Sequence, residues 1–358
     1  MKKQTHPVIR SFTLPGLLCF AMLLVSLGIA GTPAIVHANA AKGSLARKLY
    51  YKPRGGSLRA PKTALANQRV LWLGDSITQD GKYVTFIEYY LSKEFPSEKF
   101  DIVSVGLSSE TVSGLSEKTH PFPRPDVHER LQRAIELVKP TIVVACYGMN
   151  DGIYHPQSPE RMRAFQDGIR SLITSVRAAK ARLLLLTPPP FDPKPILKKC
   201  RPIGAPDYGY SAPYEDYDKV LADYSHWELG LPKSDAQVID LHTELSNYLR
   251  QQRVKDPNFN LSTDGIHPSP AGHVLMAQLF LRGIGMNVRI DDPVQETARI
   301  GQDPLLQLIR EQREKRSAGW LSFIGYTRGQ VVKSDSVDST EKTNAVLQQR
   351  IDDLRRVH

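Results

Sequence analysis

The chain has 358 residues, of which 41% are hydrophobic and 23% are charged, and its formal net charge at pH 7 is +10. This length and apolar content are enough for one well-packed domain with a small additional segment. The basic residues form no long run and accompany no nucleic-acid-binding module, which argues against a nucleic-acid partner. We interpret the charge as favouring solubility or attraction to an anionic envelope or polymer.

Residues 1–40 have the features of a signal peptide for export. A positively charged head precedes an apolar stretch over 14–30, and Ala38-Asn39-Ala40 forms a small-residue cleavage site. An uncleaved membrane anchor is the alternative, but the apolar stretch is short for a span and is interrupted by proline and glycine. We therefore expect cleavage near Ala40, an exported (periplasmic or secreted) protein and no stable membrane anchor afterwards.

The first predicted strand of the mature chain ends in a candidate nucleophile. The apolar run over 70–73 stops at Gly74-Asp75-Ser76, which is typical of a buried parallel strand whose carboxyl end opens into a tight turn. Ser76 is the candidate nucleophile. The same triplet also fits an ordinary helix N-cap, since Asp and Ser are common there, so its interpretation depends on the stretches that follow.

Strand-like and helix-like stretches alternate from residue 70 onward. The later strand-like stretches are nearly all apolar and cover 101–105, 141–147, 182–187 and 237–241. Between them, apolar residues recur at helical spacing, as in the run of Leu131, Ile135 and Val138. Strands that are apolar on both faces need helices on both faces of a parallel sheet. The pattern therefore predicts an α/β domain with three layers.

Polar residues at the ends of these stretches complete a site for acyl transfer. A serine hydroxyl is a poor nucleophile and needs a base, which His267 can be. Asp264, three residues earlier, can fix the tautomer of that imidazole and stabilise its cationic form. The candidate donors to a developing oxyanion are the backbone N–H groups of Ser76 and Gly106 and the side-chain amide of Asn150.

These stretches resemble the four sequence blocks of the SGNH (GDSL-type) hydrolase family, in the family's order, over roughly 70–285. The four matching segments are Gly74-Asp75-Ser76, Gly106, Gly148-Met149-Asn150-Asp151 and Asp264-Gly265-Ile266-His267. The first block departs from the longest form of the family signature, because Ile77-Thr78-Gln79-Asp80 follows and the next glycine is Gly81. The resemblance implies five parallel strands in a flavodoxin-like order, with the catalytic loops at their carboxyl ends.

The stretch over 188–213 contains eight prolines and predicts a long irregular loop. Because it follows a strand on the catalytic edge, we interpret it as one wall of the substrate site. Tyr208, Tyr210 and Tyr214 are candidates for stacking on a sugar face, with packing of the loop itself as an equal alternative. The polar and aromatic residues of 151–155 are further candidates for lining the pocket.

The end of the chain differs in character from the domain before it. A helix over 269–283 is predicted to follow the candidate histidine, and beyond 291 the charges balance while apolar residues become sparse. This extension either covers the catalytic edge or binds a partner. We therefore divide the chain into a signal peptide over 1–40, a leader segment over 41–66, an SGNH hydrolase domain over 67–288 and a C-terminal helical extension over 289–358.

The site predicts a serine carboxylesterase that works through a Ser-His-Asp acyl-enzyme. The export signal, the open loop-lined edge and the lack of a large apolar lid favour short-acyl substrates, above all acetyl esters of carbohydrate. A lipase or lysophospholipase and an O-acyltransferase remain alternatives, since they share the serine chemistry. A non-catalytic cell-envelope binding module is a further alternative, but it has no need of all five site residues.

The chemistry implies a small-molecule or polysaccharide ester as partner and no cofactor. No metal-ligand spacing occurs among the cysteines and histidines, so we predict no metal site. Outside the signal peptide, Cys146 falls in a predicted buried strand and Cys200 in a loop, and we expect no disulfide between them. The oligomeric state is open.

Overall fold

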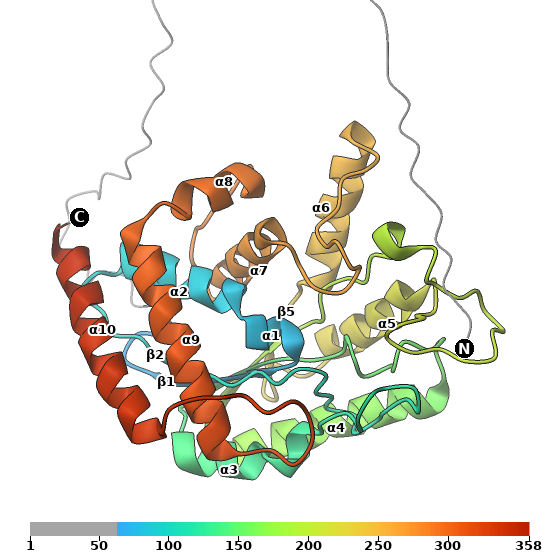
Figure 1. The fold of residues 1–358 in the computed structure, drawn as a ribbon, viewed down its shortest axis with the longest axis horizontal. Helices are drawn as coiled ribbons and strands as arrows, with labels where there is room; N and C mark the ends of the chain where they lie inside the picture. Colours follow the sequence, from blue (N-terminus) through green and yellow to red (C-terminus); the bar gives the residue numbers. More distant parts are fainter. Residues whose placement is uncertain (1–62, 358) are drawn as a thin grey trace, which may run out of the picture. The chain divides into compact units, whose positions relative to one another are not determined.

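The computed structural model describes residues 63–357, so the predicted signal peptide and nearly all of the predicted leader lie outside the described residues. Within the described part, a five-stranded parallel sheet has the order β2-β1-β3-β4-β5, with helices on both faces (Figure 1). This is the flavodoxin-like order of a doubly wound fold, and it confirms the predicted fold class. None of the helices described is long and apolar enough to cross a membrane.

The strands lie where the apolar stretches predict them, and most end one or two residues earlier. They are β1 (Arg69–Gly74), β2 (Asp101–Ser104), β3 (Ile142–Cys146), β4 (Arg182–Leu186) and β5 (Gln237–Ile239). Every residue of β3 is buried, as expected for a central strand with helices on both sides. The last residues of the predicted stretches belong to the following loops and form hydrogen bonds there. Thr187, for example, accepts hydrogen bonds from the backbone of Leu241 and His242.

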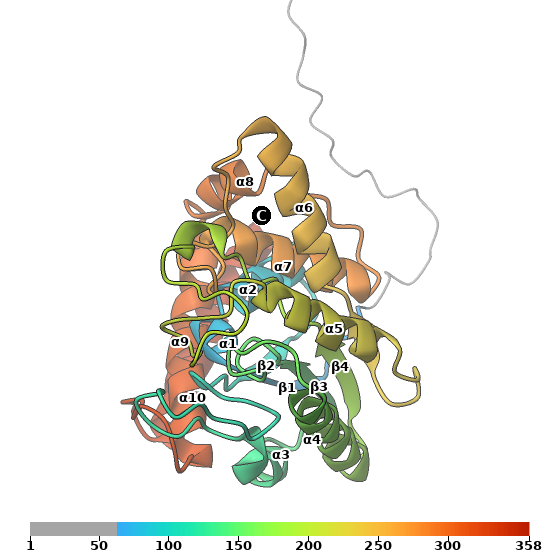
Figure 2. The ribbon, with the colours of Figure 1, turned by 90° about the vertical axis from the view of Figure 1, so that its right-hand side faces the viewer.

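The helices form two layers around this sheet (Figure 2). One layer contains α1 (Ser76–Asp80), α2 (Lys82–Glu94), α6 (His242–Lys255) and α7 (Pro270–Gly283). The other contains α3 (Leu131–Val138), α4 (Pro159–Ala178) and α5 (Tyr217–Leu229). Both α4 and α7 begin with a capping serine followed by proline, a sequence that favours a helix start at that point.

The long proline-rich loop is irregular, apart from one short 3-10 helix, η2 (Lys194–Ile196). A second 3-10 helix, η1 (Val127–Glu129), precedes α3. Two of the three tyrosines proposed for sugar stacking, Tyr208 and Tyr214, are buried and pack the loop itself. Tyr210 remains 42% exposed, so it alone of the three keeps a free ring surface.

The C-terminal extension packs beside β2, one of the two edge strands of the sheet. It contains α8 (Pro293–Ile300), α9 (Pro304–Ile324) and α10 (Val337–Val357). α9 contacts β2, α2 and α3 (Figure 1). It shares the core of the domain through buried residues such as Trp320. The Arg316 side chain donates a 3.2 Å hydrogen bond to the carbonyl of Ile102 in β2. The extension thereby covers a sheet edge that would otherwise expose unpaired backbone groups.

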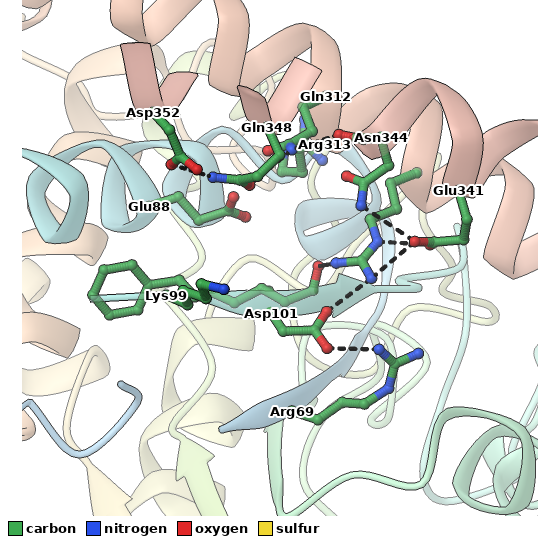
Figure 3. Close-up of a pocket in the computed structure, with 13 residues that line it drawn as sticks. Arg69, Glu88, Lys99, Asp101, Gln312, Arg313, Glu341, Asn344, Gln348 and Asp352 are labelled. Atoms are coloured by element: carbon green, nitrogen blue, oxygen red, sulfur yellow. Dashed lines mark hydrogen bonds and ion pairs between the residues drawn. The ribbon is translucent and has the colours of Figure 1, made fainter. Parts of the chain in front are cut away.

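A polar cavity of about 380 Å³ lies between this extension, α2 and the first two strands (Figure 3). Its charged side chains largely pair with one another. Arg316 contacts Asp101 and Glu341 at 2.8 Å each, and Arg69 contacts Asp101 at 2.6 Å. These contacts join α9, α10 and the sheet. Glu88, in contrast, has one carboxyl oxygen with no hydrogen-bond partner among the described residues, and burial raises its pKa to about 7.

Candidate active site

The structure brings Ser76, His267 and Asp264 into one hydrogen-bonded line. Ser76 is the first residue of α1, separated from the end of β1 by Asp75 alone, and its Oγ lies 2.8 Å from Nε2 of His267. On the other side of the ring, Nδ1 of His267 lies 2.8 Å from Oδ2 of Asp264. Because an ionised carboxylate only accepts hydrogen bonds, Nδ1 donates to Asp264 and Nε2 is left to accept the serine proton.

The short segment before α7 is shaped by the carboxylate of Asp264. Its Oδ1 accepts hydrogen bonds from the backbone N–H groups of Ile266 at 3.0 Å and His267 at 2.8 Å. Gly265 adopts a φ of +79°, and a Cβ there would lie 2.5 Å from the carbonyl oxygen of Asp192. One carboxylate therefore shapes the turn with one oxygen and holds the imidazole with the other, which explains the three-residue spacing.

The charges of this pair suit a general base. The hydrogen bond to Asp264 raises the pKa of His267 above its ordinary value, although burial acts in the opposite direction. Burial alone would raise the pKa of Asp264, but its hydrogen bonds to His267 and Ile266 outweigh burial and lower it. The side chains of His267 and Asp264 are 44% and 52% exposed. Both candidate catalytic side chains therefore lie at the surface of the domain.

Asp75, between the glycine and the serine, confirms the N-cap interpretation of the triplet. Its Oδ1 accepts a 2.9 Å hydrogen bond from the backbone N–H of Ile77, which caps α1. Burial raises the pKa of Asp75 to about 7, while the nearby His267 lowers it. The cap and the nucleophile are thus neighbouring residues of one turn, so the two interpretations are compatible.

Gly106 lies beside the nucleophile turn. The backbone N–H of Leu107 donates to the carbonyl of Gly74 at 2.9 Å, which extends the pairing of the first two strands beyond β2. A Cβ at Gly106 would lie 2.4 Å from the backbone nitrogen of Gln79, so only glycine fits against α1. Among the described residues, no protein acceptor pairs with the N–H of Gly106. The N–H of Ser76, at the first position of a helix, likewise has no intrahelical acceptor.

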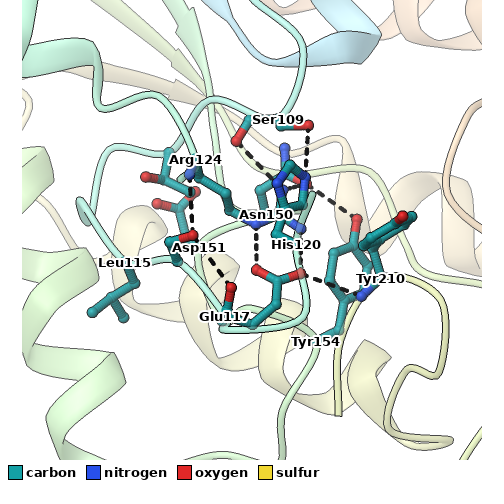
Figure 4. Close-up of polar contacts among 12 residues, drawn as sticks. Ser109, Leu115, Glu117, His120, Arg124, Asn150, Asp151, Tyr154 and Tyr210 are labelled. Carbon is teal, nitrogen blue, oxygen red and sulfur yellow. Dashed lines mark hydrogen bonds and ion pairs between the residues drawn. The ribbon is translucent and has the colours of Figure 1, made fainter. Parts of the chain in front are cut away.

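The Asn150 side chain is held mainly by its oxygen (Figure 4). Oδ1 accepts hydrogen bonds from Arg124 Nη1 at 2.9 Å and from the Tyr154 hydroxyl at 3.1 Å. Nδ2 has only long contacts, 3.3 Å to the carbonyl of Glu110 and 3.5 Å to Oδ2 of Asp75. The amide nitrogen is therefore turned toward the residue before Ser76 and is loosely engaged, as an oxyanion donor requires.

The family model described as the GDSL-like Lipase/Acylhydrolase family matches residues 72–275, more than half of the chain. The matched range contains Ser76, Gly106, Asn150, Asp264 and His267. The protein belongs to the GDSL-like lipase/acylhydrolase family. It is therefore an ester hydrolase, and the resemblance seen in the sequence is confirmed.

Three similar chains are distant in sequence from this GDSL-family esterase. An acetylxylan esterase from Geobacillus stearothermophilus is 21% identical over 242 residues, covering 62% of this chain and 95% of its own. The crystal structure of a catalytic mutant of an acetylxylan esterase from the same organism is 19% identical, has a TM-score of 0.47, and covers 64% of this chain and 100% of its own. A gut microbial diltiazem-metabolizing enzyme is 19% identical, with a TM-score of 0.45, covering 63% of this chain and 49% of its own.

The residues after Asn150 in this esterase do not form one surface, in contrast to the expectation that they line the pocket. Asp151 is fully buried, and its carboxylate accepts 2.8 Å hydrogen bonds from the backbone of Gly148, Val112 and Ser113. It joins two loops and is not a pocket residue, because three N–H donors occupy it. Tyr154 is also buried, and its hydroxyl reaches the asparagine.

Four charged residues next to the site were missed by sequence reasoning. Arg124 pairs with Glu117, and Arg130 pairs with Glu110, each arginine forming two contacts with its carboxylate. All four side chains are at most 1% exposed. They lie in or just after the irregular stretch that follows β2, where charged residues usually face solvent, so the sequence contains no signal for their burial.

The described residues contain no group of three or more His, Cys, Asp or Glu side chains placed to hold a metal ion. Cys146 is buried in β3, Cys200 lies partly exposed in the proline-rich loop, and both are free thiols.

Proposed function

We propose that this GDSL-family esterase is an exported serine carboxylesterase that hydrolyses short-acyl, above all acetyl, esters of carbohydrate. The observation that carries the proposal is the line from Ser76 through His267 to Asp264, with two successive 2.8 Å contacts. In a family of acylhydrolases, such a line supplies a nucleophile, its base and the group that orients the base.

The proposed reaction has two halves. His267 takes the proton of Ser76 as Oγ attacks the ester carbonyl, and the N–H groups of Ser76, Gly106 and Asn150 stabilise the oxyanion. The tetrahedral intermediate collapses, the alcohol leaves with the proton from His267, and an acyl-serine remains. Water then attacks the acyl-serine with His267 again as base, which releases the carboxylic acid and restores the serine.

Two features support a carbohydrate ester as the substrate. The half-exposed side chains of His267 and Asp264 allow a bulky alcohol to remain outside while its acyl group reaches Ser76. Tyr210 keeps an exposed ring and packs edge-on against His120 with ring centroids 5.3 Å apart. An aromatic ring held in this way offers a stacking face for a sugar. The acetylxylan esterase relative agrees with this substrate class.

The nucleophile is tested with p-nitrophenyl acetate and p-nitrophenyl octanoate, comparing the purified protein with Ser76→Ala. We expect turnover of the acetate that depends on Ser76 and weak turnover of the octanoate. A preference for octanoate would instead indicate lipid esters. Absence of serine-dependent hydrolysis of both esters would contradict the proposal and favour acyl transfer or the binding-module alternative.

The carbohydrate is tested at Tyr210. Stacking contributes about 0.5–1.5 kcal/mol, so Tyr210→Ala should raise KM for acetylated xylo-oligosaccharides about two- to tenfold. Turnover of p-nitrophenyl acetate, which has no sugar, should not change. Tyr210→Phe keeps the ring and serves as the matched control. An equal effect of Tyr210→Ala on both substrates would argue against sugar stacking.

Export is proposed from residues 1–40, with cleavage near Ala40. Expression of the full chain in a bacterial host, followed by fractionation and N-terminal sequencing, tests this directly. We expect a shortened chain beginning near Ala41 in the periplasm or medium. A full-length chain that stays in the membrane would support the anchor alternative.

A further inference from the structure

Two arginines are buried directly behind the candidate oxyanion donors, and the proposed reaction assigns them no role. Arg124 contacts Glu117 at 2.6 and 2.7 Å, and Arg130 contacts Glu110 at the same two distances. Burying an ion pair costs desolvation energy, and a hydrophobic pair of similar size is often as stable. Stability alone is therefore a weak explanation for two such pairs beside one site.

Arg124 reaches the amide of Asn150. Its Nη1 donates to Oδ1 of Asn150 at 2.9 Å, and the guanidinium carbon lies 5.5 Å from the ring centre of Tyr154, whose hydroxyl binds the same oxygen (Figure 4). Because a guanidinium only donates, this contact fixes which end of the asparagine amide is oxygen. The amide nitrogen is therefore left as the donor that faces the nucleophile turn.

Arg130 makes the same kind of contact with a backbone amide. Its Nη2 donates a 2.7 Å hydrogen bond to the carbonyl oxygen of Val105. That carbonyl and the N–H of Gly106 belong to one peptide group, and peptide groups are planar. A guanidinium on the oxygen of this peptide thus fixes its plane and, with it, the direction of the Gly106 N–H.

A hydrogen bond to the oxygen of an amide draws electrons toward that oxygen and makes the N–H of the same amide a stronger donor. The effect is larger when the donor is charged. Burial alone would lower the pKa of both arginines, but Glu117 and Glu110 outweigh it and the pKa of each arginine is raised. Both guanidiniums therefore keep their charge at any pH at which the esterase works.

We propose that Arg124 and Arg130 are positioning residues that fix and polarise two donors of the oxyanion hole, the amide of Asn150 and the peptide N–H of Gly106. The proposal rests on the proposed acyl-enzyme function. In this proposal Arg124 acts on the Asn150 amide and Arg130 acts on the Gly106 N–H. Because the two donors are different, experiments can tell the two arginines apart.

The test measures kcat and KM for p-nitrophenyl acetate with Arg124→Met and Arg130→Met, each in the wild-type and the Asn150→Ala backgrounds. We expect each arginine change to lower kcat about tenfold in the wild type with little change in KM, less than the loss of a whole donor. In Asn150→Ala, the change at Arg124 should cost less than twofold further. The change at Arg130 should keep its full effect there, because Gly106 is still present.

Two further variants separate positioning from folding. Arg316→Met is the matched control. Arg316 is also a buried, ion-paired arginine, and it donates to a backbone carbonyl, that of Ile102 in β2. It should lower the melting temperature without a tenfold loss of kcat. Combining Arg124→Met with Glu117→Gln avoids leaving an unpaired buried charge, so it allows the measurement if Arg124→Met alone fails to fold. Arg124→Lys, which keeps the charge, should recover part of kcat.

The proposal is overturned if the loss at Arg124 is as large in Asn150→Ala as in the wild type, or if Arg316→Met lowers kcat equally. It is also overturned if the paired Arg124 and Glu117 variant folds with unchanged kcat. Failure of the underlying function has a different signature, because Ser76→Ala and Asn150→Ala would then retain the activity of the wild type.

Discussion

The two sides of the active site are built in opposite ways. On the nucleophile side, His267 and Asp264 lie three residues apart in one half-exposed segment and depend on each other. On the donor side, Asn150 and Gly106 come from separate loops and are supported by buried charges. The first side is a local arrangement that stays open to solvent. The second is a tertiary arrangement, and it keeps its dipoles oriented because it is buried.

This difference implies that variants on the two sides fail in different ways. A substitution among the exposed residues should remove chemistry with little effect on stability, since few contacts are lost. A substitution among the buried charges should affect both chemistry and stability. Four predictions follow from this contrast, from the largest expected effect to the smallest.

The largest effect is expected for Asp264→Asn on the nucleophile side. Asparagine can keep the turn through its oxygen, but it favours the wrong tautomer of His267, and the comparable change in a serine protease lowers kcat about 10⁴-fold. We expect a loss of about that size in p-nitrophenyl acetate hydrolysis, with a melting temperature close to that of the wild type. A loss below tenfold would mean that Asp264 does not orient the base.

Asn150→Ala should have the next largest effect. Removal of one oxyanion donor costs on the order of a hundredfold or more in kcat, with little change in KM. Because the side chain is buried and bound by Arg124 and Tyr154, we also expect a lower melting temperature, unlike Asp264→Asn. Turnover near that of the wild type would remove Asn150 from the oxyanion hole.

The pH dependence of kcat/KM should place the titration of the base above the ordinary histidine value of 6.5, because the hydrogen bond to Asp264 raises the pKa of His267. Activity should rise with pH as the imidazole loses its proton and becomes able to accept one from Ser76. The nearby Asp75 contributes to the raised pKa of His267, so Asp75→Asn should move the midpoint to lower pH. A profile that stays flat down to pH 4 would exclude His267 as the base.

The smallest effect is expected on stability, and it concerns a buried acid with no arginine partner among the described residues. Glu228 in α5 is fully buried, and neither carboxyl oxygen has a partner among the described residues. Burial raises its pKa well above the usual range, so the folded state keeps a proton that the unfolded state loses as pH rises. Stability is therefore lost progressively above about pH 4.5.

Glu228→Gln should remove this loss and raise the melting temperature, by an amount that grows from pH 5 to pH 8. Glu117→Gln is the matched comparison, because its carboxylate has the arginine partner that Glu228 lacks. It should lower the melting temperature instead, as expected when an arginine remains buried without its partner. If both variants change the melting temperature equally at pH 8, the arginine partner does not determine how much a buried carboxyl group destabilises the fold.

Much of the fold follows from local patterns. The apolar stretches predict all five strands of the described sheet, and the three central strands follow most directly, because a central parallel strand must be apolar on both faces. The same patterns place Ser76 and Asn150 just after the carboxyl ends of two strands. Because the strands are parallel neighbours, these ends lie on the same side of the sheet. The ends of the strands were predicted less well, since residues such as Thr187 support loops that only the fold defines.

The sequence by itself predicted the candidate nucleophile, base and carboxylate, because each belongs to a short segment whose spacing is set by local geometry, as the turn at Asp264 illustrates. Only the tertiary structure decided that Arg124 and Arg130 are buried against Asn150 and Val105, and that α9 covers the edge of β2. Burial of a charge depends on partners contributed by other segments, and no periodicity along the chain records where those partners will meet.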